Sequence, residues 1–221
     1  MLPEIECKYY STDKLPQSCH GKINSKLLER FFAGKEYFFE GFKDNFIEMY
    51  QFFCNECSDL FIVQVGGDYY HWGIASDDKY IFSAIPKTPR DLNVRISEKP
   101  YYLALPDFLK PFYSSMSGLD VSQKEMLSLH ENGFLLSFPN WHDLNSLKKY
   151  KSQDSEFISF LDRTGSTDYR IIFRSLENQL VFLDLSTTSS KLLIADWDDF
   201  STLRELENPI DFFTKSFFNL F

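Results

Sequence analysis

The chain has 221 residues, of which 43% are hydrophobic and 25% charged; this composition fits one large or two small globular domains and excludes a disordered chain. Its formal net charge is −9, so we expect no direct binding to nucleic acid and a surface that suits a basic protein. Aromatic residues make up 18%, including 24 Phe and 12 Tyr. So many rings are difficult to bury completely, and aromatic residues left on the surface favour a protein-binding site.

The first residues, Met1 to Cys7, are acidic and lack the apolar segment of a signal peptide. Nowhere does the sequence contain the roughly 18 consecutive apolar residues that a membrane helix needs. We therefore expect a cytoplasmic protein that does not contact membranes, in which the cysteines stay reduced.

Residues 1–21 contain Pro3, Pro16 and Gly21, which predict irregular structure. After them the apolar residues recur first at helical spacing and then in strand-like runs, while residues 37–42 are ambiguous between the two. We predict helices at 25–32 and 45–57, followed by an antiparallel meander of strands at 60–65, 69–75 and 80–85.

Residues 86–100 hold three prolines and little periodicity, and predict a linker. The segment 1–95 would then be an N-terminal extension of two helices and a strand meander. The second unit would span residues 100–221, although both could form one continuous domain.

The second unit begins with Leu105–Gly118, which predicts a short helix entered through Pro106 and stopped at Gly118. Further on, Asn208 and Pro209 are typical of the start of a helix, which would close the chain. Predicted helices lie at 106–116, 121–131, 141–150, 157–161 and from 209 onward, and predicted strands at 133–138, 169–173, 180–185 and 191–197. The fold class is therefore α+β, with an antiparallel sheet flanked by helices.

Cys54 and Cys57 have a spacing that can place two thiolates on one metal ion. Cys7, Cys19 and His20 could complete such a site, which would make the protein a zinc-containing adaptor. The competing interpretation is that both cysteines lie on an aromatic helix face and pack as small hydrophobic residues.

No nucleophile elbow, metalloprotease motif or phosphate-binding loop occurs in the sequence, so we assign no catalytic residue and no cofactor. One alternative is a small-molecule-binding protein or enzyme with a pocket near Tyr69–Trp72. There His71 stands beside Trp72, and it could equally be a half-buried strand histidine beside a core tryptophan.

A second candidate site places three carboxylates around an indole at the end of a predicted strand. Asp196, Trp197, Asp198 and Asp199 form this run. They could make an acidic interaction surface with an aromatic anchor. They could also be a solvated loop whose Trp197 tucks into the core.

Three features resemble the SUKH superfamily of cell-wall assembly regulators and bacterial immunity proteins. The first is Leu105-Pro106 followed by an aromatic pair and Gly118. The second is the strand series over 171–199, with Leu183-Asp184 and Asp196-Trp197, and the third is Asp211-Phe-Phe213 in the closing helix. The resemblance covers roughly residues 100–221.

This resemblance implies a SUKH-like α+β fold and a non-enzymatic role. Many bacterial members are immunity proteins that bind a cognate toxin in the cytosol and block it. A nuclease toxin is basic, and the net charge of −9 would suit it. The resemblance thus implies a protein that neutralises a basic toxin, and it carries over no catalytic residue.

Overall fold

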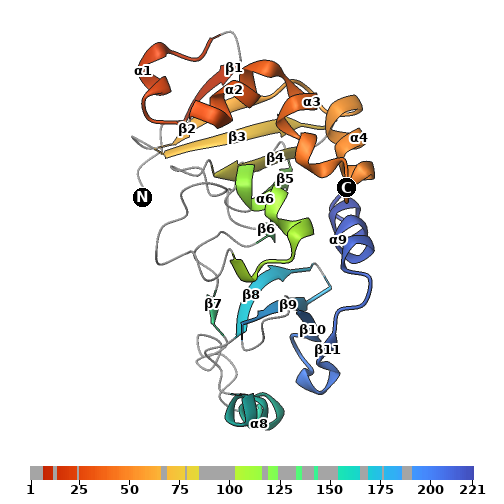
Figure 1. Ribbon diagram of the computed structural model, residues 1–221. Coiled ribbons are helices and arrows are strands. Elements are labelled where there is room, and N and C mark those ends of the chain that lie inside the picture. Colours follow the sequence, from red (N-terminus) through yellow and green to blue (C-terminus); the bar gives the residue numbers. More distant parts are fainter. Residues whose placement is uncertain are drawn as a thin grey trace.

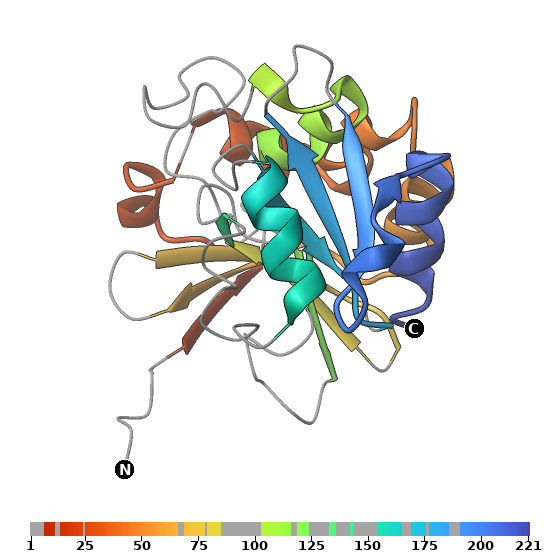
Figure 2. The same ribbon diagram turned by 90° about the horizontal axis from the view of Figure 1, so that it is seen from below.

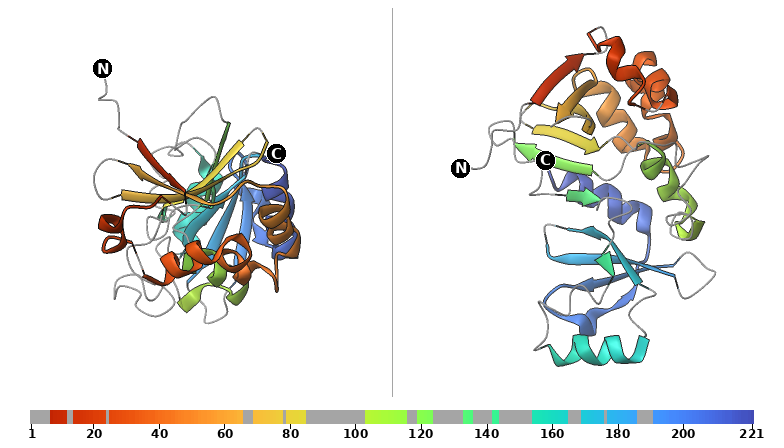
Figure 3. Two further views of the ribbon diagram at one scale, coloured as in Figure 1. Left: turned by 90° about the horizontal axis from the view of Figure 1, so that it is seen from above. Right: turned by 90° about the vertical axis from the view of Figure 1, so that its left-hand side faces the viewer.

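The computed structural model describes residues 7–11, 14–23, 25–65, 69–77, 79–84, 103–115, 119–123, 133–135, 142–143, 154–164, 169–175, 177–185 and 191–221. Two antiparallel sheets are combined with helices that pack on their faces, which confirms the predicted α+β class. Figures 1 and 3 show the two sheets following one another along the molecule. The helices α2 to α4 lie at one end of it, and α8 lies at the other (Figure 1).

The first sheet, called sheet A here, has six strands that pair in chain order, each antiparallel to the next. The predicted meander forms its centre and is confirmed. Its strands are β1 (Cys7–Ser11), β2 (Phe61–Val65), β3 (Tyr69–Ala75), β4 (Lys79–Ala84), β5 (Leu119–Gln123) and β6 (Gly133–Leu135).

Two strands of sheet A correct the sequence prediction. Residues 7–11, predicted to be irregular, form β1 because they pair with β2, about fifty residues later in the chain. The predicted helix 121–131 is wrong at its start, since β5 pairs with β4 and places Val121 opposite Ile81. Both strands are fixed by partners distant in sequence, which local periodicity does not reveal.

The pairing of β4 with β5 joins residues on either side of the predicted linker. The predicted linker, residues 86–100, lies outside the described residues. The proposed division into segments 1–95 and 100–221 therefore stays a prediction, although one sheet spans it.

The second sheet, sheet B, has the strand order β11-β10-β9-β8-β7 and is antiparallel throughout. The three long strands were all predicted, because short polar sequences separate their apolar runs. In contrast, the predicted helix 141–150 is wrong at its start, where His142–Asp143 pairs with β8. The strands are β7 (His142–Asp143), β8 (Tyr169–Arg174), β9 (Gln179–Asp184), β10 (Leu192–Asp196) and β11 (Arg204–Glu205).

Most predicted helices are confirmed, with boundaries shifted by a few residues. The ambiguous segment 37–42 is helical. The helices are α1 (Gln17–His20), α2 (Ser25–Ala33), α3 (Lys35–Phe38), α4 (Ile47–Asn55), α6 (Lys110–Ser115), α8 (Ser155–Thr164) and α9 (Pro209–Phe218), with single turns η1 (Glu40–Phe42), η2 (Asp107–Leu109) and η4 (Phe200–Thr202).

The larger of two cores is rich in aromatic residues and joins α2, α3, α4, α6 and α9 to both sheets. Phe53 of α4 lies at its centre: its ring stacks on Phe39 at 4.2 Å and meets Phe217 of α9 at 5.4 Å. Because α9 packs on α4 in this way, the C-terminal helix shares one core with the helices from the first quarter of the chain. Two large apolar residues of these helices stay outside the core: Phe32 of α2 is 47% exposed and Ile47 of α4 is 49% exposed.

Sheet A uses a glycine where two rings cross its surface. Gly73 of β3 pairs with Phe61 on one side and with Phe82 on the other. A Cβ atom at Gly73 would lie 2.4 Å from the Phe61 ring and 2.9 Å from the Phe82 ring. The absent side chain therefore makes room for these aromatic neighbours.

Sheet B is covered on both faces. Alternate residues of β9 point to opposite sides, so Val181 and Leu183 join the main core, while Leu180 and Phe182 join a smaller one. The smaller core is closed by Phe157 of α8, which lies across the sheet in Figure 2. No helix in the described part of the chain is long and apolar enough to cross a membrane.

Candidate functional site

The run Asp196–Asp199, called the acidic loop here, begins at the last residue of β10 and continues beyond the strand. Asp198 and Asp199 are exposed, whereas Asp196 and Trp197 are half-buried. Asp196 pairs with Gln179 at the start of β9, so the loop lies at the end of sheet B where the β8–β9 turn also lies. The structure thus places all four predicted residues on one short, partly exposed connection.

Hydrogen bonds fix the shape of the acidic loop. Asp199 Oδ1 accepts from the Ser201 backbone N–H at 2.9 Å and from the Ser201 hydroxyl at 2.6 Å, so Asp199 caps η4. The Thr202 hydroxyl donates to the Asp199 carbonyl at 2.6 Å and accepts from the Asp196 N–H at 2.9 Å. The loop is therefore ordered by its own residues, and a partner would not need to order it.

The hydrogen bonds from Ser201 lower the pKa of Asp199 below its ordinary value. A lowered pKa in the folded state stabilises the fold above the unfolded pKa, and this contribution is lost as the pH falls through the folded pKa. We expect Ser201→Ala to raise the pKa of Asp199 toward its ordinary value, as followed by NMR titration of the carboxyl carbon. Ser25→Ala, at an exposed position on α2 at the other end of the molecule, is the control. An unchanged pKa in Ser201→Ala would contradict this cause.

Trp197 connects the acidic loop to the β8–β9 turn. Its backbone N–H donates to the Asn178 carbonyl at 2.8 Å, and the Arg174 guanidinium lies 5.6 Å from the centre of its indole ring. The same Arg174 donates to Asn178 Oδ1 at 3.0 Å. The indole also packs against the smaller core. Trp197 therefore contributes both to that core and to the surface of the acidic loop.

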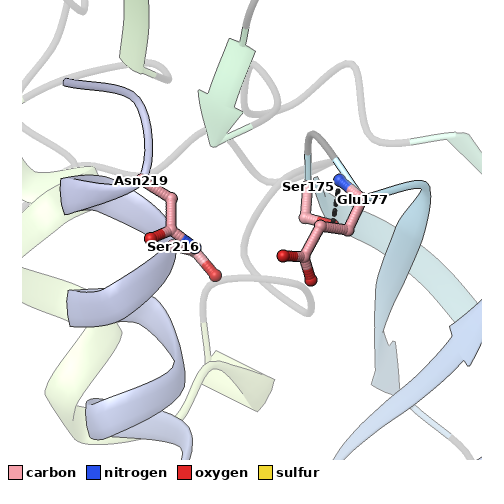
Figure 4. A pocket seen from close by; sticks show the side chains of 4 residues that line it. All are labelled: Ser175, Glu177, Ser216 and Asn219. Carbon is pink, nitrogen blue, oxygen red and sulfur yellow. Dashed lines mark hydrogen bonds between the residues drawn. The ribbon is translucent and has the colours of Figure 1, made fainter.

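A polar pocket of about 330 Å³ lies between the β8–β9 turn and α9 (Figure 4). It is lined by Ser175 and Glu177 from the turn and by Ser216 and Asn219 from the C-terminal end of α9. Sequence reasoning missed this site because its two halves are about forty residues apart. The polar turn was visible in the sequence, but nothing there indicated which helix would face it.

Cys54 and Cys57, the predicted metal-binding pair, are half-buried and buried respectively, and both are free thiols. Burial raises the pKa of the Cys57 thiol to about 12, and burial also raises the pKa of Cys54. Across the residues with described positions, no three His, Cys, Asp or Glu side chains are grouped so that they could hold a metal ion.

We expect Cys57 in the folded protein to react with a thiol reagent at pH 8 at least about 100-fold more slowly than in urea, because its thiolate is scarce and shielded. The rates can be measured by mass spectrometry of the labelled peptides. Labelling of Cys57 at the same rate in both conditions would contradict the burial seen here.

The alternative pocket near Tyr69–Trp72 gains no support from the described side chains. Trp72 is 1% exposed, and its ring meets Phe38 at 5.4 Å and Phe39 at 5.5 Å inside the main core. His71 lies half-buried on the opposite face of β3. These contacts correspond to the interpretation of a strand histidine beside a core tryptophan.

Comparisons of the chain with protein-family models, with curated proteins and with solved structures find no match.

Proposed function

We propose that this chain is a non-enzymatic immunity protein that binds a cognate basic toxin, such as a nuclease, in the cytoplasm and neutralises it. The observation that carries the proposal is the acidic loop. Two exposed carboxylates, Asp198 and Asp199, directly follow the half-buried Trp197 on a connection that its own hydrogen bonds hold in place. Such a surface offers charge at the rim and an aromatic anchor near the centre.

The overall charge supports the same partner. A net charge of −9 attracts a basic protein and speeds its association, and it repels nucleic acid. A protein that competes with nucleic acid for the basic surface of a nuclease needs a negative charge, as the nucleic acid has. The resemblance to the SUKH superfamily points to the same class of partner.

The proposal predicts that a toxin gene lies beside the gene for this chain, and the toxin domain that it encodes provides the test. We expect the two purified proteins to elute together in size-exclusion chromatography, and the toxin to lose its activity at an equimolar ratio. A toxin domain from an unrelated system is the control and should elute separately. Separate elution of the cognate pair at micromolar concentration would contradict the proposal.

A further inference from the structure

The polar pocket between the β8–β9 turn and α9 combines one carboxylate with an amide and two hydroxyl groups. Its described lining consists of the Glu177 carboxylate, the Asn219 amide and the hydroxyls of Ser175 and Ser216. One of these four residues is negatively charged and none is positively charged. The lining therefore favours a cation and disfavours an anion.

The acceptor groups face the space between the two elements. Figure 4 shows the Glu177 carboxylate and the Ser216 hydroxyl directed toward one another across the pocket. Among the residues that the structure describes, no ion pair or hydrogen bond occupies the Glu177 carboxylate.

The position of Glu177 is fixed by the turn that carries it. The Ser175 hydroxyl oxygen accepts from the N–H groups of Glu177 and Gln179, at 3.2 and 3.0 Å. Asn178 adopts a left-handed conformation, with φ of 61°. The carboxylate is thus presented on an ordered turn, which reduces the cost of ordering it in a complex.

The pocket adjoins the acidic loop. The Asn178 carbonyl accepts the N–H of Trp197, so the turn that lines the pocket is bonded to the loop. Both features lie at one end of sheet B, and α9 reaches that end with Ser216 and Asn219. A protein bound at the acidic loop could therefore insert a side chain into the pocket.

We propose that this pocket holds the guanidinium group of an arginine side chain of the basic partner. Arginine presents several N–H donors in a planar fork that pairs with a carboxylate through two hydrogen bonds, and neighbouring oxygens can accept the remaining N–H groups. A volume of about 330 Å³ has room for such a side chain. This inference rests on the proposed function for the source of the arginine, but not for the chemistry of the pocket.

The chemistry is tested on the isolated chain with N-butylguanidinium and with butylurea, which has a similar shape and no charge. We expect N-butylguanidinium, at millimolar concentration, to shift the amide NMR signals of Glu177, Ser216 and Asn219, and butylurea not to shift them. In Glu177→Gln the affinity should fall about tenfold, as for a lost hydrogen bond to a charged group. Glu207→Gln, at an exposed residue before the other end of α9, should bind like the parent chain. Equal responses to both compounds, or an unchanged affinity in Glu177→Gln, would overturn the proposal.

The source of the arginine is tested on the complex with the cognate toxin. We expect Glu177→Gln to raise the dissociation constant about tenfold and Glu207→Gln to leave it unchanged. If N-butylguanidinium binds at the pocket but Glu177→Gln leaves the complex as tight as before, the partner arginine is refuted. If no toxin binds at all, the proposed function fails, and the small-molecule titration still decides the chemistry of the pocket.

Discussion

Phe53→Ala is expected to lower the free energy of unfolding by about 3–5 kcal/mol. Phe53 is fully buried, and its ring contacts those of Phe39, Phe42 and Phe217. Removing it leaves a cavity where α4 meets α9, and the surrounding rings can fill that cavity only in part. Urea unfolding followed by circular dichroism measures the change, with an unaltered m-value as the sign that the folded state is intact.

The matched control is Phe32→Ala, which deletes the same side chain at a position that is 47% exposed. We expect this variant to lose less than about 1 kcal/mol. Equal losses in the two variants would show that the aromatic core centred on Phe53 does not dominate stability.

If this chain binds a toxin as proposed, the double variant Asp198→Asn with Asp199→Asn is expected to slow association with that toxin about tenfold at low salt. Both carboxylates are exposed on the acidic loop. Their negative charge should therefore change the association rate of a basic partner more than the stability of the complex once it has formed. Asparagine at 199 can still accept the hydrogen bonds that cap η4, so the loop should keep its shape. Stopped-flow measurement of the association rate, at low and high salt, provides the test.

Asp44→Asn with Glu48→Gln removes the same charge from exposed positions around the start of α4, away from the acidic loop. This control should slow association much less. If both double variants slow it equally, net charge alone guides the partner and the acidic loop is not its binding surface.

The parts of the fold that sequence reasoning predicted are those set by neighbours in the chain. The strands β8, β9 and β10 follow one another in the sequence and pair in that order, so their apolar runs and the short polar sequences between them were sufficient. The helix α9 was predicted from Asn208 and Pro209, and Pro209 is its first residue.

The parts that were wrong depend on distant partners. The strand β1 exists because β2 offers it an edge, and β5 exists because β4 does. Residues 119–123 contain no proline or glycine, and their mixture of apolar and polar residues fits a strand as well as a helix. Only the pairing decides between them.

The candidate site shows the same contrast between features set by neighbours in the chain and features set by distant partners. The acidic loop could be recognised because its carboxylates and indole are adjacent in the sequence. That Trp197 would lie beside Arg174 and bond to Asn178 could not be predicted, since it requires the β8–β9 register. The polar pocket required in addition that α9 pack so that Ser216 faces the turn.

Growth of cells that express the toxin domain, with and without this chain, tests the central claim most directly. We predict that co-expression restores growth and that the double variant at Asp198 and Asp199 restores it less well at matched protein levels. Growth arrest that is equally deep with and without the chain would contradict the claim that this protein neutralises the toxin.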